Sequence, residues 1–227
     1  MKLDQWSGLL VTGTDTGIGK TWVSALIIEE LRKKGVEAVG LKPVLSGSRE
    51  DAERLWEANG GALDLDAINP WWYQTPAAPL VASRIEGSPL EVEPMVEYIH
   101  KIQGAHDFTL VEGVGGWEVP MGEGFSFEDY ARALGFPVMV VAANWLGTIN
   151  HTLLTVKAIQ AAGLECLGVI LNHLEAERDV AATTNRMMLE ELCPVPIIGE
   201  VLTDADWIDW TDSKSEGNGH KEAHSNY

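Results

Sequence analysis

Basic residues are scarce in this chain of 227 residues. It carries 16 Lys and Arg against 34 Asp and Glu, which gives a formal net charge of −18 at pH 7. A surface with this charge repels the phosphates of nucleic acids and the headgroups of anionic membranes. We therefore expect neither a nucleic acid nor a membrane among its partners.

Long apolar runs and cysteines are also few. No stretch approaches the ~20 consecutive apolar residues of a membrane-spanning helix, and residues 1–7 show no basic start followed by an apolar run, as a signal peptide would. Cys166 and Cys193 are far apart and form no Cys-x-x-Cys pair, which argues against a zinc or redox motif. These features predict a cytoplasmic protein with two reduced thiols.

The middle of the chain contains no Gly-, Ser- or Pro-rich linker and no internal repeat. We therefore predict one domain over residues 1–210. Residues 211–227 lack apolar side chains apart from Ala223 and Tyr227. Such a segment cannot bury enough surface to offset its ordering entropy, so we expect a disordered polar tail.

Short apolar runs alternate with amphipathic stretches along the chain. Continuous apolar runs suit strands that are buried on both faces, and their alternation with helices indicates a mostly parallel, doubly wound α/β sheet of the P-loop NTPase type. The expected strands are 8–13, 38–41, 108–111, 137–142, 167–171 and 195–198. The expected helices are 20–34, 51–59, 91–103, 127–134, 152–162 and 179–192.

The strongest motif lies where the first expected strand ends. It runs from Gly13 to Thr21 with the sequence GTDTGIGKT and leads into a helix. Small residues allow successive backbone N–H groups to face one anion, and the helix N-terminus adds its positive dipole end. Lys20 would reach the β and γ phosphates of a nucleotide, and Thr21 would coordinate Mg²⁺. The strict pattern requires glycine where Thr14 stands, so the alternative is a glycine-rich turn before Lys-Thr.

Two further loops follow neighbouring strands and should face the same crevice, since ligands bind at the carboxyl ends of parallel strands. Lys42 follows the second strand and is placed near the γ phosphate, although an ordinary solvated lysine is an equal alternative. Glu112 ends the third strand and precedes glycine-rich residues. With Thr21 and Asp51, it supplies three oxygen ligands for Mg²⁺.

A third loop, Leu146 to His151, has the sequence LGTINH and precedes another helix. Its N–H groups could bind a second anion, such as a substrate carboxylate. On mechanics alone, helix capping by Thr148 or Asn150 is the more ordinary explanation.

Taken together, these pieces resemble the dethiobiotin synthetase family. The matching segments are VTGTDTGIGKT (11–21), KPVLSGS (42–48) with Asp51, VEGVGGW (111–117), LGTINH (146–151) and Asn172. They occur in order over residues 11 to about 200, and Thr14 agrees with the phosphate loop of that family. The resemblance implies an ATP-dependent ligase that uses CO₂ and Mg²⁺ to convert 7,8-diaminopelargonate to dethiobiotin.

The resemblance also implies roles for individual residues. Lys20 and Lys42 would stabilise the transferred phosphoryl group, and Ser46 would contact the carbamate or the substrate. The segment Gly147, Thr148, Ile149 and Asn150 would bind the substrate carboxylate from a partner subunit, which implies a homodimer. Asn172 would bind adenine. The other candidate nucleotide contacts are Thr16, Gly17, Ile18, Gly19, Thr21, Trp22, Asp51, Glu112, Gly113, Val114, Gly115, His173 and Leu202.

Some positions differ from the family pattern. A Gly-x-Ile-Pro segment usually helps to hold the base, whereas this chain has Gly199-Glu200-Val201-Leu202, and Leu80 stands where histidine is common. Two alternatives have other functions: a ParA/MinD-like nucleotide switch, and a nucleotide-binding paralogue without ligase activity. The switch is disfavoured because its early second lysine is replaced here by Asp15.

Overall fold

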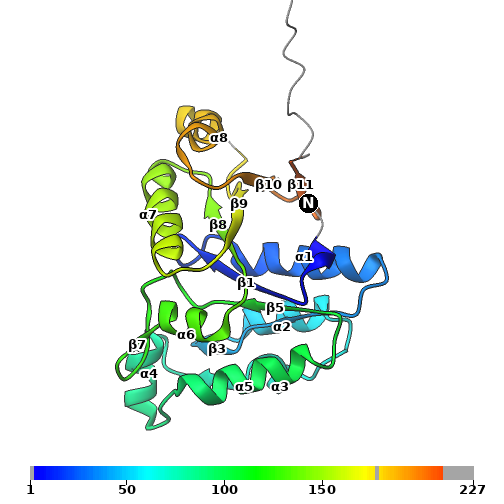
Figure 1. The fold of residues 1–227 in the computed structure, drawn as a ribbon, viewed down its shortest axis with the longest axis vertical. Coiled ribbons are helices and arrows are strands. Elements are labelled where there is room, and N and C mark those ends of the chain that lie inside the picture. The colour runs from blue at the N-terminus through cyan, green and yellow to red at the C-terminus, as the bar shows by residue number, and fades with distance from the viewer. Residues whose placement is uncertain (1–2, 177–178, 212–227) are drawn as a thin grey trace, which may run out of the picture.

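The structure is a computed structural model that describes residues 3–176 and 179–211; the expected tail therefore lies almost entirely outside the described residues. Its centre is a seven-stranded sheet with the order β11-β10-β9-β8-β1-β5-β2, parallel except for the β10–β11 pair (Figure 1). The strands are β1 (Gly8–Gly13), β2 (Ala38–Leu41), β5 (Phe108–Glu112), β8 (Val138–Ala143), β9 (Cys166–Asn172), β10 (Ile197–Val201) and β11 (Asp209–Trp210).

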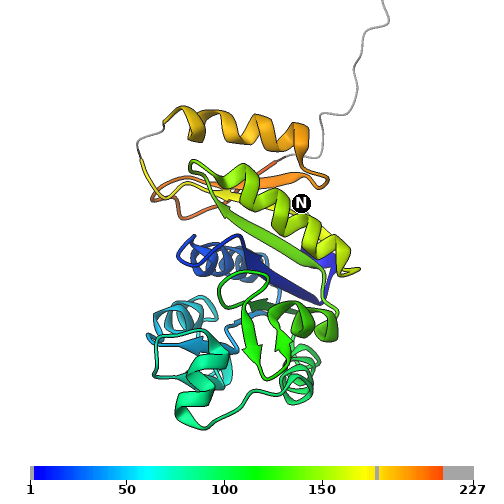
Figure 2. The same cartoon turned by 90° about the vertical axis from the view of Figure 1, so that its left-hand side faces the viewer.

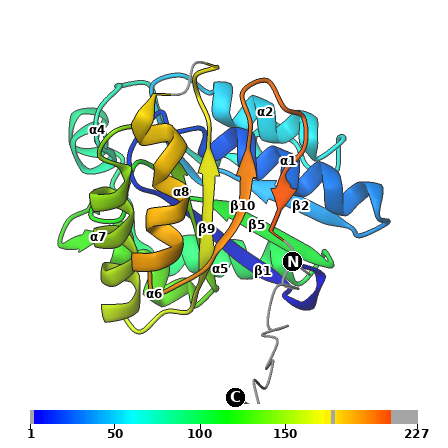
Figure 3. The same ribbon diagram turned by 90° about the horizontal axis from the view of Figure 1, so that it is seen from above.

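Helices cover both faces of this sheet, as the views in Figures 1 and 3 show. The helices α1 (Lys20–Lys33) and α2 (Glu50–Ala58) lie on one side, and α7 (Thr148–Ala161) and α8 (Val180–Leu192) lie on the other. The remaining helices are η1 (Leu3–Gln5), α3 (Leu65–Ile68), α4 (Pro79–Glu86), α5 (Val92–Gln103) and α6 (Phe127–Leu134). The predicted fold class is confirmed.

Burial explains why the apolar runs form central strands. All residues of β1 and β8 are buried, because helices pack on both of their faces. Such strands need no alternation of polar and apolar residues. None of the described helices is long and apolar enough to cross a membrane.

The bounds of α7 and β10 differ most from the predicted ones; most of the other predicted elements differ by one residue at an end. Helix α7 begins at Thr148, four residues before the predicted Thr152, because Gly147 adopts a left-handed conformation (φ +99°) and starts the helix without a capping side chain. Neither Thr148 nor Asn150 is therefore the cap. Strand β10 begins at Ile197 rather than Val195, since Pro194 and Pro196 flank Val195 and lack an N–H for the ladder.

Two small sheets were not predicted from the sequence. Parallel strands β3 (Val44–Ser46) and β4 (Trp71–Tyr73) form one, and the antiparallel pair β6 (Pro120–Gly122) and β7 (Phe125–Ser126) forms the other. In Figure 2 both small sheets lie in the lower half of the molecule, with β6 and β7 drawn as green arrows. The segment after β3 and the turn before α4 both contribute to the main cavity described below.

One buried side chain completes the edge of the main sheet. Asn59 is fully buried, accepts a hydrogen bond from the Gly40 N–H (2.7 Å) and donates to the Gly40 carbonyl (3.0 Å). Gly40 lies in β2, the edge strand. The amide of Asn59 thus replaces a neighbouring strand for the outward-facing backbone groups.

We predict that Asn59→Ala leaves both backbone groups of Gly40 buried without partners and destabilises the fold by about 2 to 4 kcal/mol. Equilibrium unfolding in urea measures this change. The exposed α5 variant Glu97→Ala serves as the control and should change stability by less than about 0.5 kcal/mol. An Asn59→Ala variant as stable as wild type would contradict the assigned role.

Candidate active site

The phosphate loop connects β1 to α1, as the sequence predicts. Gly17 and Gly19 both have positive φ (73° and 85°), a conformation that other residues rarely adopt. A Cβ on Gly19 would lie 2.1 Å from Nδ2 of Asn172, so the loop could not keep this path with a larger residue. The loop therefore has the backbone geometry of an anion cradle directly before a helix N-terminus.

Lys20 lies within this loop and is almost fully buried. Its Nζ donates a hydrogen bond to the carbonyl oxygen of Asp15 (2.7 Å). Burial, together with the nearby positive charge of Lys42, lowers the pKa of Lys20 to about 8. An anion bound in the cradle would restore the charged form of this lysine.

Lys42 is buried and lies at the centre of a cluster of charged side chains. Its Nζ lies 2.5 Å from Oε1 of Glu112, 3.1 Å from Oδ2 of Asp51, and donates to the Gly113 carbonyl (3.0 Å). Burial alone would lower the pKa of Lys42, but the two carboxylates outweigh it and raise the pKa. Lys42 is therefore a buried cation held by two acids, and the solvated-lysine alternative is wrong.

Glu112 brings the third predicted ligand into the same cluster. Thr21 Oγ1 donates a hydrogen bond to Oε1 of Glu112 (2.8 Å), while Oε2 of Glu112 is buried and has no hydrogen-bond partner among the described residues. Burial would raise the pKa of Asp51, but Lys42 lowers it overall, so this carboxylate stays charged. An unpartnered buried carboxylate oxygen beside a hydroxyl and a second carboxylate fits a hard cation such as Mg²⁺.

A cavity of about 690 Å³ opens onto these groups. It brings together residues from the phosphate loop, β3, α2 and the segment after β5. Predicted residues that line it are Thr16, Gly17, Gly19, Lys20, Thr21, Lys42, Ser46, Asp51, Glu112, Val114 and Gly115. Gly113 contributes its carbonyl to Lys42, and Ile18 is buried behind the loop.

The same cavity has features that suit a polar substrate beside the phosphates. Ser46 Oγ is buried and has no partner among the described residues. The sequence interpretation missed the wall formed by residues 76–79 and Val119. The run Pro76-Ala77-Ala78-Pro79 could have indicated a rigid turn before a helix, since Pro79 occupies the first position of α4.

A second cavity, of about 400 Å³, adjoins the first at Gly19. It is lined by Gly19, Trp22, Asn172, His173, Leu174, Leu202, Thr203 and Asp204, which include four of the predicted nucleotide contacts outside the loop. Asn172 Nδ2 donates to the Ile18 carbonyl (2.9 Å), so the amide is fixed against the phosphate loop. A nucleotide could thus place its phosphates in the larger cavity and its base in this one.

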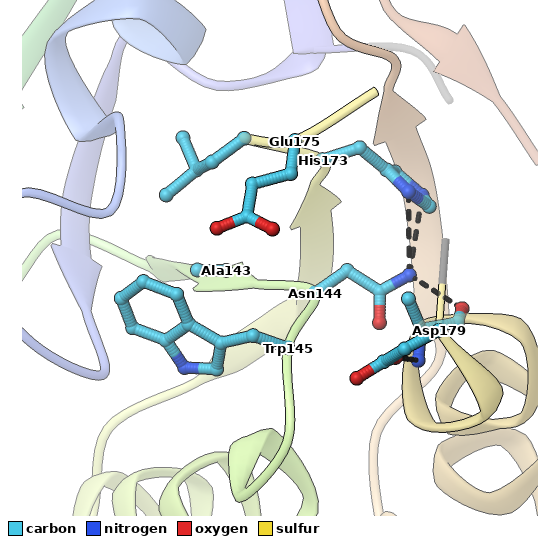
Figure 4. A pocket seen from close by; sticks show the side chains of 8 residues that line it. Ala143, Asn144, Trp145, His173, Glu175 and Asp179 are labelled. Carbon is cyan, nitrogen blue, oxygen red and sulfur yellow. Dashed lines mark hydrogen bonds between the residues drawn. The ribbon is translucent and has the colours of Figure 1, made fainter. Parts of the chain in front are cut away.

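A third cavity, of about 260 Å³, lies between the carboxyl ends of β8 and β9 (Figure 4). The amide of Asn144 lies 3.4 Å from both ring nitrogens of His173 and donates to the Ala182 carbonyl (2.9 Å). His173 Nε2 in turn lies 3.1 Å from Oε1 of Glu200. This network connects the carboxyl ends of β8, β9 and β10 through His173, which also lines the second cavity.

The predicted substrate segment 147–150 forms the first turn of α7 and lines none of these three cavities. Thr148 is buried, and its Oγ1 has no partner among the described residues. Just before it, Leu146 is 81% exposed.

Comparisons with known proteins agree with one another. A family model described as an AAA domain matches residues 7–208. The ATP-dependent dethiobiotin synthetase BioD of Akkermansia muciniphila is 46% identical over 200 residues, covering 88% of this chain and 94% of the relative. The enzyme of the same name from Bacillus velezensis is 38% identical over 194 residues, covering 83% of each chain.

Solved structures support the fold. A MinC:MinD complex of Aquifex aeolicus matches with a TM-score of 0.58 at 17% identity, covering 87% of this chain and 81% of that chain. A ParA family ATPase of Chlorobium tepidum matches with a TM-score of 0.55 at 14% identity, covering 87% and 85%. At these identities the likeness concerns the P-loop fold and not the activity.

The lowered pKa of Lys20 generates a prediction. At about pH 8.5 most Lys20 is neutral in the free protein, and bound phosphates raise its pKa, so binding of ADP should take up a fraction of a proton. ADP itself is fully ionised at this pH because its phosphate pKa is about 6. Calorimetry in buffers of different ionisation enthalpy measures the uptake. The Lys20→Arg variant should bind ADP without taking up a proton. If the wild-type protein takes up no proton on binding ADP, the lowered pKa of Lys20 is wrong.

Proposed function

Because the chain belongs to the family of ATP-dependent dethiobiotin synthetases, we propose that it is an ATP-dependent ligase that closes the cyclic urea of dethiobiotin from 7,8-diaminopelargonate and CO₂. The observation that carries this proposal is the cluster of Lys42, Glu112 and Asp51 beside the phosphate loop in one cavity. The cluster supplies a cation and two carboxylates, and the phosphate loop supplies backbone N–H groups, at the place where a γ phosphoryl group would be transferred.

The reaction needs no protein nucleophile. One substrate amine adds to CO₂ and loses a proton, which gives a carbamate. The carbamate oxygen attacks the γ phosphorus of ATP, ADP leaves, and a carbamic–phosphoric anhydride remains. The second amine then attacks the anhydride carbonyl, loses a proton and expels phosphate as the ring closes. The protein supplies alignment and charge stabilisation. Ser46 and Ser48 line the main cavity, but among the described residues no Cys lines it, and no His lines it that could activate either serine as a nucleophile.

The side chains that line the two cavities have distinct roles in this proposal. Lys20 and Lys42 offset the negative charge that spreads over the phosphoryl oxygens during transfer. Ser46 Oγ, which lacks a partner in the protein, is available to the carbamate or the substrate. Asn172 Oδ1 is available to the base, because only Nδ2 is bonded to the loop.

Mg²⁺ fits the site and belongs to the proposal. Thr21, Asp51 and Glu112 would hold it, as the unpartnered Oε2 of Glu112 supports. The ion would neutralise charge on the phosphate oxygens. Two carboxylates and a hydroxyl provide fewer ligands than Mg²⁺ needs. Phosphate oxygens of the nucleotide and water molecules would provide the others.

We further propose a homodimer in which residues 147–150 of one subunit bind the substrate carboxylate in the site of the other. Two observations support it: this segment lines none of the three cavities described above, and the neighbouring Leu146 and Leu154 are 81% and 60% exposed. Sedimentation that finds only a 24.7 kDa species in the presence of substrate contradicts it. We place the enzyme in the cytoplasm, where its two free thiols would stay reduced.

Product analysis tests the function directly. Purified protein is incubated with MgATP, bicarbonate and 7,8-diaminopelargonate, phosphate release is followed, and dethiobiotin is detected by mass. Product that depends on every component is the expected result. ATP hydrolysis that does not depend on the diamine would favour a nucleotide switch, and binding without turnover would favour a paralogue that lacks ligase activity.

Lys42 provides the sharpest variant. Lys42→Ala removes the cation from the phosphoryl-transfer region, so kcat should fall at least about 100-fold. Circular dichroism and ADP binding show whether the fold and the phosphate loop persist. The exposed lysine variant Lys101→Ala is the matched control and should keep wild-type turnover. A folded Lys42→Ala protein with wild-type kcat would falsify the role of this lysine.

A further inference from the structure

Trp22 occupies an unusual position in the second cavity. It directly follows Lys20 and Thr21 in the first turn of α1, and its indole is 39% exposed. It lines the cavity of about 400 Å³ together with Asn172, Leu174 and Leu202. Because Gly19 borders both this cavity and the phosphate site, a nucleotide held by the loop directs its base toward this indole.

Two contacts hold the indole in place. The guanidinium carbon of Arg54 lies 5.1 Å from the ring centroid, within cation–π range, and Arg54 is itself bonded to Glu29 (2.7 Å). On the ring edge, Nε1 donates to the carbonyl of Ala205 (3.1 Å). The indole is therefore fixed between α2 and the loop that connects β10 to β11.

These two contacts leave part of the indole surface available to a planar ligand. One ring face is covered by a cation, one edge is hydrogen bonded, and the remaining surface borders the cavity. A fixed aromatic ring is a good surface for a nucleobase, since every base offers a π face. Arg54 withdraws electron density from the indole, which favours stacking on an electron-rich purine.

We propose that Trp22 is a positioning residue that stacks on the nucleobase of the nucleotide. The proposal rests on the proposed function, and it divides base recognition in two. Trp22 supplies affinity without selecting hydrogen-bonding groups, whereas the fixed amide of Asn172 supplies the directional contact. The segment Leu202 to Asp204 lines the same cavity.

Two substitutions of Trp22 distinguish stacking of its ring on the base from its hydrogen bond to the loop that contains Ala205. Trp22→Phe keeps an aromatic ring and loses the bond to Ala205, and Trp22→Leu keeps apolar volume and loses the ring. Trp56→Leu, on α2 and outside the cavities, is the matched control for removing an exposed indole. The dissociation constants of ADP and of inorganic tripolyphosphate, which has no base, are measured by calorimetry.

We expect Trp22→Leu to weaken ADP binding about tenfold, which corresponds to about 1.4 kcal/mol. Trp22→Phe should weaken it by less than about threefold, and tripolyphosphate binding should stay within about twofold of wild type. In the synthetase assay, Trp22→Leu should raise KM for ATP with little change in kcat, because the base does not take part in the transfer.

Three results would overturn the proposal: Trp22→Leu binds ADP like wild type, Trp22→Leu weakens both ligands equally, or Trp22→Phe is as weak as Trp22→Leu. The second assigns the residue to the phosphate loop, and the third assigns it to the Ala205 bond. A wild-type protein that binds ADP and makes no dethiobiotin defeats the proposed function alone. A wild-type protein that does not bind ADP defeats both.

Discussion

The site depends on one buried cation. Lys42, at the carboxyl end of β2, contacts Glu112 at the end of β5 and Asp51 at the start of α2. A buried lysine without such partners would lose its charge, and two neighbouring carboxylates without a cation would repel each other. The cluster thus keeps Lys42 and Asp51 charged next to the phosphate loop. Its position also requires that β2 and β5 stay adjacent, which the sheet enforces.

The sheet places these groups by a simple rule. Parallel strands bring their carboxyl ends to one edge, and the loops after β1, β2 and β5 therefore meet although their residues are up to 91 positions apart. The burial of β1 on both faces makes this edge rigid. The chemistry proposed for the site needs alignment of two substrates and no protein nucleophile, so rigidity is the property that matters most.

The sequence was most informative where one local pattern determines one element. The strands 8–13 and 38–41 and the helix 127–134 have the predicted bounds, because continuous apolar runs and an amphipathic helix each have one stable environment. Contacts between distant segments were less accessible. The pairing of Val44–Ser46 with Trp71–Tyr73 depends on two short strands that only the tertiary fold brings together. The start of α7 depends on the positive φ of Gly147, which the residue pattern before the helix does not reveal.

Gly19 links two recognition tasks that evolution would otherwise adjust separately. It borders both the cavity proposed for the phosphates and the cavity proposed for the base, and a single added carbon would collide with the Asn172 amide. Drift at this position therefore disturbs the triphosphate and the base contact at once. Residues 202–204 border only the base cavity and are free of this double constraint. A change in nucleotide preference within such a scaffold should thus accumulate in that loop, leaving the glycine and its asparagine partner unchanged.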